Sequence, residues 1–178
     1  MGWTADDIPS LEGCVALVTG ANSGLGLESV RALAARQATV ILACRSRSRA
    51  ESAKTRLIEE GLSRLDLLDL DLADLVSVKQ AADTVRERYG QLDLLLNNAG
   101  VMAPPRTLTA QGHELQFGVN HLGHMALTQK LLPLLRSGGR VVTVTSGAQY
   151  FGRIRWDDLA WQKRYERYSA YGQSKLAN

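Results

Sequence analysis

The fold of this chain is decided by the stretch Thr19-Gly20-Ala21-Asn22-Ser23-Gly24-Leu25-Gly26. It follows the apolar run Val15-Ala16-Leu17-Val18 and precedes a helical pattern over residues 25–36. The order is therefore strand, glycine turn, helix. Glycine allows positive φ and a close approach of the backbone to a ligand. The N-terminus of the following helix presents free N–H groups and a positive dipole end. This context predicts an anion site suited to a pyrophosphate.

The glycine spacing by itself leaves a second interpretation open. Gly20-x-x-x-Gly24-x-Gly26 differs from the usual dinucleotide pattern G-x-G-x-x-G. No lysine follows where a phosphate loop of the G-x-x-x-x-G-K-[ST] kind needs one. A tight strand-to-helix connection without a ligand would also place glycines here, so the rest of the chain has to decide.

Apolar runs alternate with helical patterns along the whole chain. We expect strands at 15–18, 39–44, 65–70, 92–96 and 140–146, and helices at 25–36, 48–60, 75–89, 112–135 and 169–178. This alternation predicts an α/β fold with a doubly wound parallel sheet of five strands, Rossmann-like, with helices on both faces in three αβα layers. Asp66 and Asp69 make the third strand polar, which favours a place near a sheet edge. The length of 178 residues indicates one domain, residues 1–178.

Composition excludes several classes of function. The 21 basic and 18 acidic residues are mostly dispersed and give a net charge of +3, which does not predict nucleic-acid binding. The chain has no run of 18 apolar residues and no apolar core in its acidic N-terminal stretch 1–7, so we expect neither a membrane span nor a signal peptide. Cys14 and Cys44 each end an apolar run, which favours two buried free thiols over a disulfide and indicates a cytoplasmic protein.

Polar and glycine residues collect where the expected strands end. Residues 20–26, Arg45, Asp71, 97–100 and Ser146 all lie at or just past strand carboxyl ends. Ligands of open parallel sheets bind beyond these ends. Unrelated core and turn residues would not be expected to gather there, so the anion site becomes the better interpretation of the glycine turn.

The same residues carry a resemblance to a known family. The chain resembles the short-chain dehydrogenases/reductases in residues 19–26, Asp71-Leu72, Asn97-Asn98-Ala99-Gly100, Asn120, Ser146 and Tyr171-Gly172-Gln173-Ser174-Lys175, in the family's order. Residues 43–45, 119–124 and 174–178 resemble its retinol-dehydrogenase-like branch. The resemblance implies an oxidoreductase that passes a hydride between a nicotinamide cofactor and a small-molecule carbonyl or alcohol. It also implies that a homo-oligomer can form.

The expected catalytic residues are Asn120, Ser146, Tyr171 and Lys175. Tyr171 and Lys175 stand at i and i+4 of a helix and share one face. A nearby ammonium favours the ionised form of a phenol, so Tyr171 could exchange a proton with an alkoxide or alcohol. A surface Tyr–Lys pair is the alternative. Ser146 is expected to end the fifth strand and to hydrogen-bond the carbonyl oxygen, with Thr145 facing the opposite way. The resemblance assigns Asn120 to a water-mediated proton relay.

Arg45 decides the predicted cofactor. An acidic residue about 20 positions past the glycine loop would hold the 2′-hydroxyl of NAD, whereas an Arg accommodates a 2′-phosphate. Arg45, with Arg47 close by, therefore predicts NADP over NAD. By its match to the family, Asp71 is expected to contact the adenine edge. The alternative is an Asp at a helix N-terminus, and the two roles could overlap. The predicted cofactor-binding set is Gly20, Asn22, Ser23, Gly24, Leu25, Gly26, Arg45, Asp71, Leu72, Asn98, Ala99, Gly100, Tyr171 and Lys175.

Two further features need an interpretation. His121 and His124 stand at i and i+3, but no third ligand accompanies them, so no metal is predicted. Members of the resembled family continue for further strands beyond the Tyr–Lys helix, whereas this sequence stops at Asn178. An alternative function is therefore a truncated, non-catalytic NADP-binding or interaction module, with the fifth strand as an exposed edge.

Overall fold

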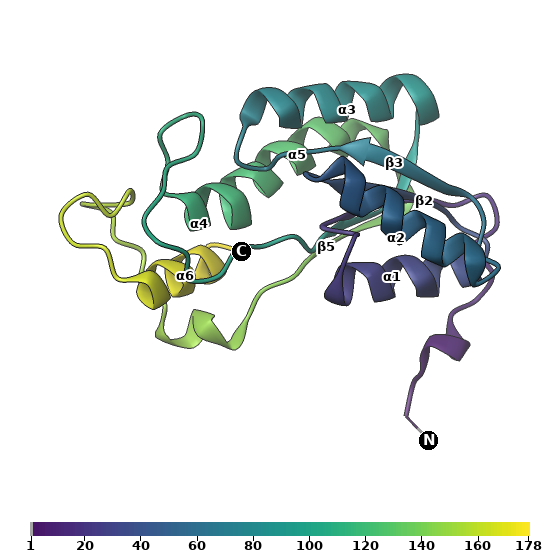
Figure 1. Ribbon diagram of the computed structural model, residues 1–178, viewed down its shortest axis with the longest axis horizontal. Coiled ribbons are helices and arrows are strands. Elements are labelled where there is room, and N and C mark those ends of the chain that lie inside the picture. The colour runs from purple at the N-terminus through teal and green to yellow at the C-terminus, as the bar shows by residue number, and fades with distance from the viewer. Residues whose placement is uncertain (1) are drawn as a thin grey trace.

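A parallel sheet in the order β3-β2-β1-β4-β5 forms the centre of the computed structural model, which describes residues 2–178 (Figure 1). Met1, part of the acidic stretch 1–7, lies outside these residues. The strands are β1 Val15–Thr19, β2 Thr39–Cys44, β3 Leu65–Asp69, β4 Leu92–Asn97 and β5 Leu135–Thr143. The helices are α1 Gly24–Ala35, α2 Arg47–Glu59, α3 Leu75–Tyr89, α4 Leu115–Phe117, α5 His124–Leu131 and α6 Arg167–Leu176. Shorter 3-10 turns are η1 Ala5–Asp7, η3 Leu132–Leu134 and η4 Gly147–Phe151, and a π-helical segment, η2, spans Gly118–Gly123.

The strand order confirms the predicted doubly wound topology. Each neighbouring pair of strands is parallel. All five residues of β1 are buried, as expected for a central strand between two helical layers. β3 is an edge strand with mixed burial, as its aspartates predict. The chain moves to one side of β1 and then returns to add β4 on the other, which creates a crevice at the carboxyl ends of these two strands.

Two separate cores cover the two faces of the sheet. On one face, α3 and α5 lie side by side and bury Val78, Val85, Leu127 and Leu131 (Figure 1). On the other face, α1 and α2 bury a second cluster that contains Leu27, Val30, Leu33, Ala53 and Leu57. The predicted three-layer arrangement is therefore confirmed.

The long helical pattern predicted over 112–135 is present, but it is shorter and irregular. Helical structure begins at Leu115, passes through the π-helical segment 118–123, and ends as α5 at Leu131. Glycine lets this segment approach its neighbours, because a β-carbon on Gly123 would lie 2.5 Å from the carbonyl oxygen of Leu72. Pro133 lies in the 3-10 turn η3 that closes the helical region. Such π-helical irregularities are frequently found at functional sites.

The fifth strand also differs from the prediction. β5 begins at Leu135, includes Gly138 in a left-handed conformation (φ 81°), and ends at Thr143. Its pairing with β4 is irregular, since Leu92 pairs with Leu135 but Leu94 pairs with Arg140. Ser146 therefore lies beyond the strand and does not end it. β5 is the other edge of the sheet within residues 2–178, and its side chains are mostly exposed.

Two smaller predictions concern cysteines and membranes. Within residues 2–178 both cysteines are free, and Cys44 is buried, but Cys14 is only half-buried because it precedes β1 at the margin of the sheet. The expectation of two buried thiols is thus wrong for Cys14. None of the helices between residues 2 and 178 is both long and apolar enough to cross a membrane.

Candidate functional site

The glycine loop packs directly on the loop that follows β4. Gly20 adopts positive φ (65°), and a β-carbon there would lie 3.0 Å from the Cα of Ala99. A β-carbon on Gly26 would lie 2.4 Å from the carbonyl oxygen of Gly20 and 2.6 Å from Nδ2 of Asn98. These two positions therefore require glycine, because any side chain would push the two loops apart.

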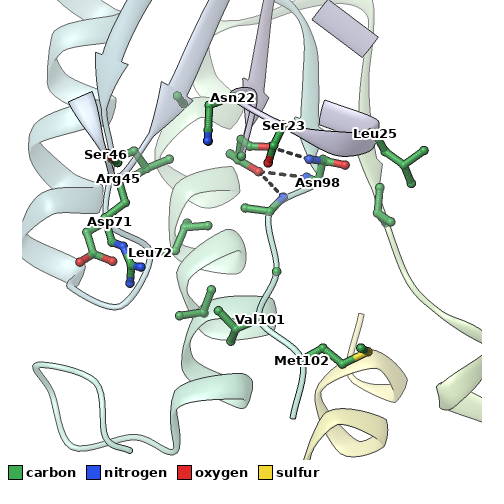
Figure 2. A pocket seen from close by; sticks show the side chains of 18 of the residues that line it. Asn22, Ser23, Leu25, Arg45, Ser46, Asp71, Leu72, Asn98, Val101 and Met102 are labelled. Atoms are coloured by element: carbon green, nitrogen blue, oxygen red, sulfur yellow. Dashed lines mark hydrogen bonds between the residues drawn. The ribbon is translucent and has the colours of Figure 1, made fainter. Parts of the chain in front are cut away.

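Thr19 joins these loops through its hydroxyl. Its Oγ1 accepts hydrogen bonds from the backbone N–H groups of Asn98 (2.9 Å) and Ala99 (3.0 Å). The side-chain amide of Asn98 donates to the carbonyl oxygen of Thr19 at 2.9 Å. Figure 2 shows this cluster between the glycine loop and the segment that follows β4. These hydrogen bonds hold the carboxyl end of β1 next to the carboxyl end of β4.

Two helix N-termini at this edge of the sheet have no side-chain cap. Neither Ser23 at the start of α1 nor Ser46 at the start of α2 caps its helix with a side-chain hydrogen bond. By contrast, the side chains of Asp74 and Glu166 cap α3 and α6. Uncapped first-turn N–H groups, together with the helix dipole, favour a bound anion. The pocket thus presents two places suited to phosphate groups.

The arginines after β2 divide into two groups. Arg45 and Arg49 line the pocket together with Ser46, and neither arginine forms an ion pair with another residue of the described range 2–178. Arg47 is instead paired with Glu51 (2.9 Å) and Asp69 (3.6 Å) and does not line the pocket. The prediction named Arg47 as the neighbour of Arg45, but the structure gives that place to Arg49. Because Arg45 precedes α2, which begins at Arg47, no helical spacing relates Arg45 to Arg49, and no local signal in the sequence marks this pair.

Asp71 lies at the pocket near the end of β3. Its carboxylate accepts a hydrogen bond from the N–H of Ala73 at 2.9 Å, and the helix that follows is capped by Asp74 instead. The alternative of Asp71 as a helix-capping residue is therefore wrong. Asp71 and Arg45 lie near each other in Figure 2.

Tyr171 and Lys175 project from α6 into the same pocket. Lys175 is only 4% exposed, and its Nζ donates to the carbonyl oxygen of Val144 at 2.9 Å. This Nζ lies 5.9 Å from the centre of the Tyr171 ring. Burial lowers the pKa of Lys175 below its ordinary value. The pair that the sequence places on one helix face thus faces one cavity.

Asn120 lies behind this pocket and does not line it. Its Oδ1 accepts from the N–H of Val101 (2.8 Å), and its Nδ2 donates to the carbonyl oxygen of Val101 (2.9 Å) and to Oγ of Ser174 (2.9 Å). The side chain is fully buried. Through these hydrogen bonds Asn120 holds the loop after β4 against α6. Its role in a proton relay stays a prediction.

Ser146 and Thr145 follow β5 at the edge of the pocket. The Ser146 hydroxyl accepts a hydrogen bond from the N–H of Ala148 at 3.3 Å, so it caps the turn η4. The Thr145 hydroxyl donates to the carbonyl oxygen of Lys175 at 2.7 Å. Because β5 ends at Thr143, strand alternation does not distinguish Thr145 from Ser146. The Thr145 hydroxyl is already bonded to α6, so Ser146 is the better candidate for the predicted hydrogen bond to the substrate carbonyl oxygen.

The pocket has a volume of about 590 Å³. It brings together most of the predicted cofactor-binding residues, while Gly24 and Gly26 shape the loop without lining it. Residues that the sequence did not single out also line it, among them Ser46, Arg49, Met102 and Val144. Apolar Leu25 and Met102 are largely exposed at its edge, which suits a surface that a ligand covers.

His121 and His124 contact different neighbours. Nδ1 of His121 lies 3.3 Å from Oδ1 of Asn178. His124 is buried, with Nε2 at 2.9 Å from the hydroxyl of Thr19 and Nδ1 at 3.1 Å from the carbonyl oxygen of Asn120. Over residues 2–178, no three His, Cys, Asp or Glu side chains gather as a metal site would require. The spacing of the histidines is explained by these separate contacts.

The five-stranded parallel sheet with helices on both faces defines a Rossmann-like α/β fold. A family model described as short chain dehydrogenase matches residues 14–177. The chain belongs to the short-chain dehydrogenase/reductase family, and its close relatives include retinol dehydrogenases, as the resemblance implied.

Named relatives and structures agree with this assignment. Human retinol dehydrogenase 12 is 44% identical over 94% of this chain and 54% of its own length. A crystal structure of a protein from Mycobacterium paratuberculosis is 47% identical, covers 99% of this chain and 62% of that one, and superposes with a TM-score of 0.89. A short chain dehydrogenase from Burkholderia cenocepacia in complex with NADP is 30% identical, covers 94% of this chain and 65% of that one, and has a TM-score of 0.74. The chain spans just over half the length of the retinol dehydrogenases that it matches.

Proposed function

We propose that this protein is an NADP-dependent oxidoreductase that passes a hydride between the nicotinamide and a small carbonyl or alcohol substrate. One observation carries the proposal. Tyr171 and Lys175, from the last helix, line the same pocket as the glycine loop and Arg45, from the first two strand ends. A proton donor and a dinucleotide cradle thus share one cavity.

The preference for NADP is supported by charge and by free N–H groups. The uncapped start of α1 suits the pyrophosphate, and the uncapped start of α2, with Arg45 and Arg49 beside it, suits the 2′-phosphate. Arg45 occupies the position at which an acidic side chain would favour the 2′-hydroxyl of NAD. The NADP complex of the Burkholderia relative supports the same cofactor.

Each catalytic side chain has a proposed role. When bound, the cofactor supplies or accepts the hydride. Tyr171 gives its phenolic proton to the developing alkoxide in reduction, or takes one from the alcohol in oxidation. Ser146 donates a hydrogen bond to the same oxygen. Lys175 uses one N–H on Val144 and keeps two for the ribose hydroxyls. Asn120 holds Val101 in place beside them.

A Tyr171→Phe variant tests the catalytic role. NADPH oxidation would be followed against a panel of aldehydes and ketones, which should include a long apolar aldehyde because several relatives are named retinol dehydrogenases. Loss of the proton donor should lower kcat by about 100-fold or more, with NADPH binding retained. Tyr168→Phe is the matched control, since Tyr168 is exposed on the same helix and does not line the pocket. Unchanged turnover in Tyr171→Phe would contradict the assignment.

A pair of arginine variants tests the cofactor preference. Arg45→Ala removes a charge that faces the pocket and should weaken NADPH binding by about 10-fold or more, the effect of losing one charge-assisted hydrogen bond. NADH binding should change little. Arg47→Ala makes the same chemical change two residues away, where the side chain serves Glu51 and Asp69, and should affect neither cofactor. Equal affinity of the wild type for NADH and NADPH would refute the preference.

The alternative of a non-catalytic NADP-binding module is favoured by one observation. The edge strand β5 leaves Val141 and Val142 37% and 46% exposed. Tight NADPH binding without turnover on any member of the panel would support the module. Turnover that depends on Tyr171 would support the enzyme.

A further inference from the structure

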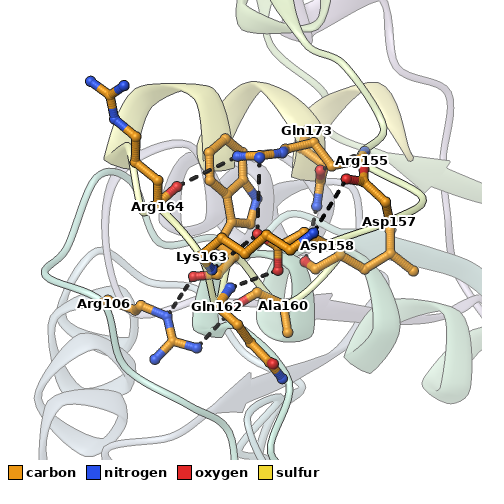
Figure 3. A network of polar contacts seen from close by, with 11 residues as sticks. Arg106, Arg155, Asp157, Asp158, Ala160, Gln162, Lys163, Arg164 and Gln173 are labelled. Atoms are coloured by element: carbon orange, nitrogen blue, oxygen red, sulfur yellow. Dashed lines mark hydrogen bonds and ion pairs between the residues drawn. The ribbon is translucent and has the colours of Figure 1, made fainter.

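The chain between η4 and α6, residues 153–165, folds on itself into a fixed unit beside α6 (Figures 1 and 3). The Asp158 carboxylate accepts hydrogen bonds from the N–H groups of Gln162 (2.7 Å) and Lys163 (3.2 Å). The Arg155 guanidinium lies 4.4 Å from the centre of the Trp161 ring, which is 4% exposed. Trp161 has positive φ (52°), a conformation that persists in a bulky residue only when its surroundings enforce it.

One end of this unit is attached to α6 through Gln173. Gln173 lies in the sequence between Tyr171 and Lys175, and its side chain is fully buried. Its Oε1 accepts from the N–H of Arg155 at 3.0 Å, and its Nε2 donates to the carbonyl oxygen of Leu159 at 3.2 Å. A buried amide has to keep its partners. The position of the unit is therefore tied to the helix that carries Tyr171 and Lys175.

The other end is attached to the loop after β4 through Arg106. Its Nε donates to the carbonyl oxygen of Trp161 at 2.9 Å, and its Nη2 donates to that of Ala160 at 3.2 Å (Figure 3). Two donors of one rigid guanidinium thus bind two successive carbonyls. The same loop contributes Val101 and Met102 to the pocket.

A second contact between the loop and the unit runs through Tyr165. Its hydroxyl donates to the carbonyl oxygen of Pro104 at 3.0 Å and accepts from Nε2 of the fully buried Gln116 at 2.9 Å. Gln116 also accepts from the N–H of Ala103 (2.8 Å) and donates to the carbonyl oxygen of Arg167 (2.8 Å). The loop, the unit and the first turn of α6 therefore share one polar network.

We propose that residues 153–165 act as a brace that fixes α6 relative to loop 101–106, and that Gln173 and Arg106 are positioning residues at its two ends. These two elements supply Tyr171, Lys175, Val101 and Met102 to one pocket. The brace does not line the pocket and acts from behind it. Its effect on catalysis rests on the proposed function, whereas the mechanical coupling does not.

Hydrogen exchange tests the coupling without any substrate. Arg106→Lys keeps the charge but replaces the forked pair of donors by a single ammonium group. Amide exchange should accelerate by about 10-fold (on the order of 1.4 kcal/mol of opening free energy) over 101–107 and over 153–165, and also in α6. Exchange in β1 and β2 should stay unchanged, which separates local release from global unfolding. Acceleration confined to 101–107 and 153–165, with α6 unaffected, would overturn the proposal.

Two further variants complete this test. Arg164→Lys makes the same chemical change within the brace, but its side chain extends away from the network in Figure 3, so exchange should match the wild type. If Arg106→Lys fails to fold, Tyr165→Phe removes one hydroxyl and should give the same pattern in α6. An unaffected α6 in that variant would equally overturn the proposal.

Steady-state kinetics then tests the consequence for catalysis. With an aldehyde that the wild type reduces, Arg106→Lys should lower kcat by about 10-fold, within the range expected for small misplacements of catalytic groups, and leave the KM for NADPH within about twofold. Adding Gln173→Met to the Arg106→Lys variant should lower kcat little further, because Gln173 and Arg106 hold the same brace. Fully additive losses would contradict a brace. Absence of any wild-type turnover would refute the proposed function and leave the exchange result to decide on the coupling.

Discussion

One buried imidazole should make the stability of this protein sensitive to acid. His124 at the start of α5 is 3% exposed. Its Nδ1 faces the carbonyl oxygen of Asn120, which can only accept, so this nitrogen is assigned the hydrogen. Its Nε2 faces the hydroxyl of Thr19, whose oxygen already accepts from the N–H groups of Asn98 and Ala99. The one hydroxyl hydrogen of Thr19 has two acceptors in reach, Nε2 at 2.9 Å and the carbonyl oxygen of Leu96 at 3.3 Å, and the shorter contact assigns it to Nε2. A second ring proton would place three donors on one hydroxyl oxygen.

The magnitude follows from the pKa of this ring. Burial lowers the pKa of His124 from the ordinary 6.5 to about 4, and the charges of Lys175 and His121 act in the same direction, against the hydrogen bond to Asn120. The folded state thus binds the proton less tightly than the unfolded state. Stability is fully present above about pH 6.5 and is lost as the pH falls toward about 4. A difference of about 2.5 pH units corresponds to about 3 kcal/mol.

Urea unfolding at a series of pH values would measure this effect. His124→Gln should cost about 1–3 kcal/mol at pH 7, because it disturbs the buried hydrogen bonds at Thr19 and Asn120. The difference in unfolding free energy between wild type and variant should then shift by about 3 kcal/mol in favour of the variant on going to pH 4. A difference that is independent of pH would refute the reasoning.

His113 provides the control for this experiment. Its side chain is exposed, so His113→Gln removes an imidazole at the surface and should change the unfolding free energy at pH 7 by less than about 0.5 kcal/mol. The chain has three histidines, so an NMR titration can follow each ring separately. The His124 ring should stay neutral down to about pH 5, one unit above its lowered pKa.

Two further predictions concern the loops around the pocket. Gly26→Ala would place a methyl group 2.4 Å from the carbonyl oxygen of Gly20, so the thermal midpoint should fall and NADPH binding, measured by fluorescence titration, should weaken by at least about 10-fold. Gly147→Ala is its control, since a β-carbon there would meet no heavy atom within 4 Å beyond its chain neighbours, and an equal loss in both variants would contradict the packing argument. Asn120→Ala should cost more than about 2 kcal/mol in urea unfolding, because the N–H and carbonyl of Val101 lose their buried partner. A cost below about 0.5 kcal/mol would show that these hydrogen bonds contribute little.

Much of the fold was predictable because its local signals are strong. β2 is a continuous apolar run, and α3 ends at Gly90, which adopts the left-handed conformation (φ 67°) that glycine favours after a helix. Both elements were predicted to the residue. The region 112–143 was predicted poorly, because apolar spacing does not distinguish a π-helical segment from an α-helix. The close contact of Gly123 with Leu72, 51 positions earlier in the chain, forms only after folding.

The sequence by itself determined the order of strand, glycine turn and helix, the placement of Tyr171 and Lys175 on one helix face, and the family. These properties depend on spacing within one element, which local backbone geometry sets. Only the tertiary structure decided that Arg49, and not Arg47, accompanies Arg45 at the pocket, and that Asn120 holds Val101. Such partners come from separate elements, and their meeting depends on how strands and helices pack. Glu51 lies within reach of Arg47 along α2, but Asp69 reaches it only because β2 and β3 are neighbours in the sheet.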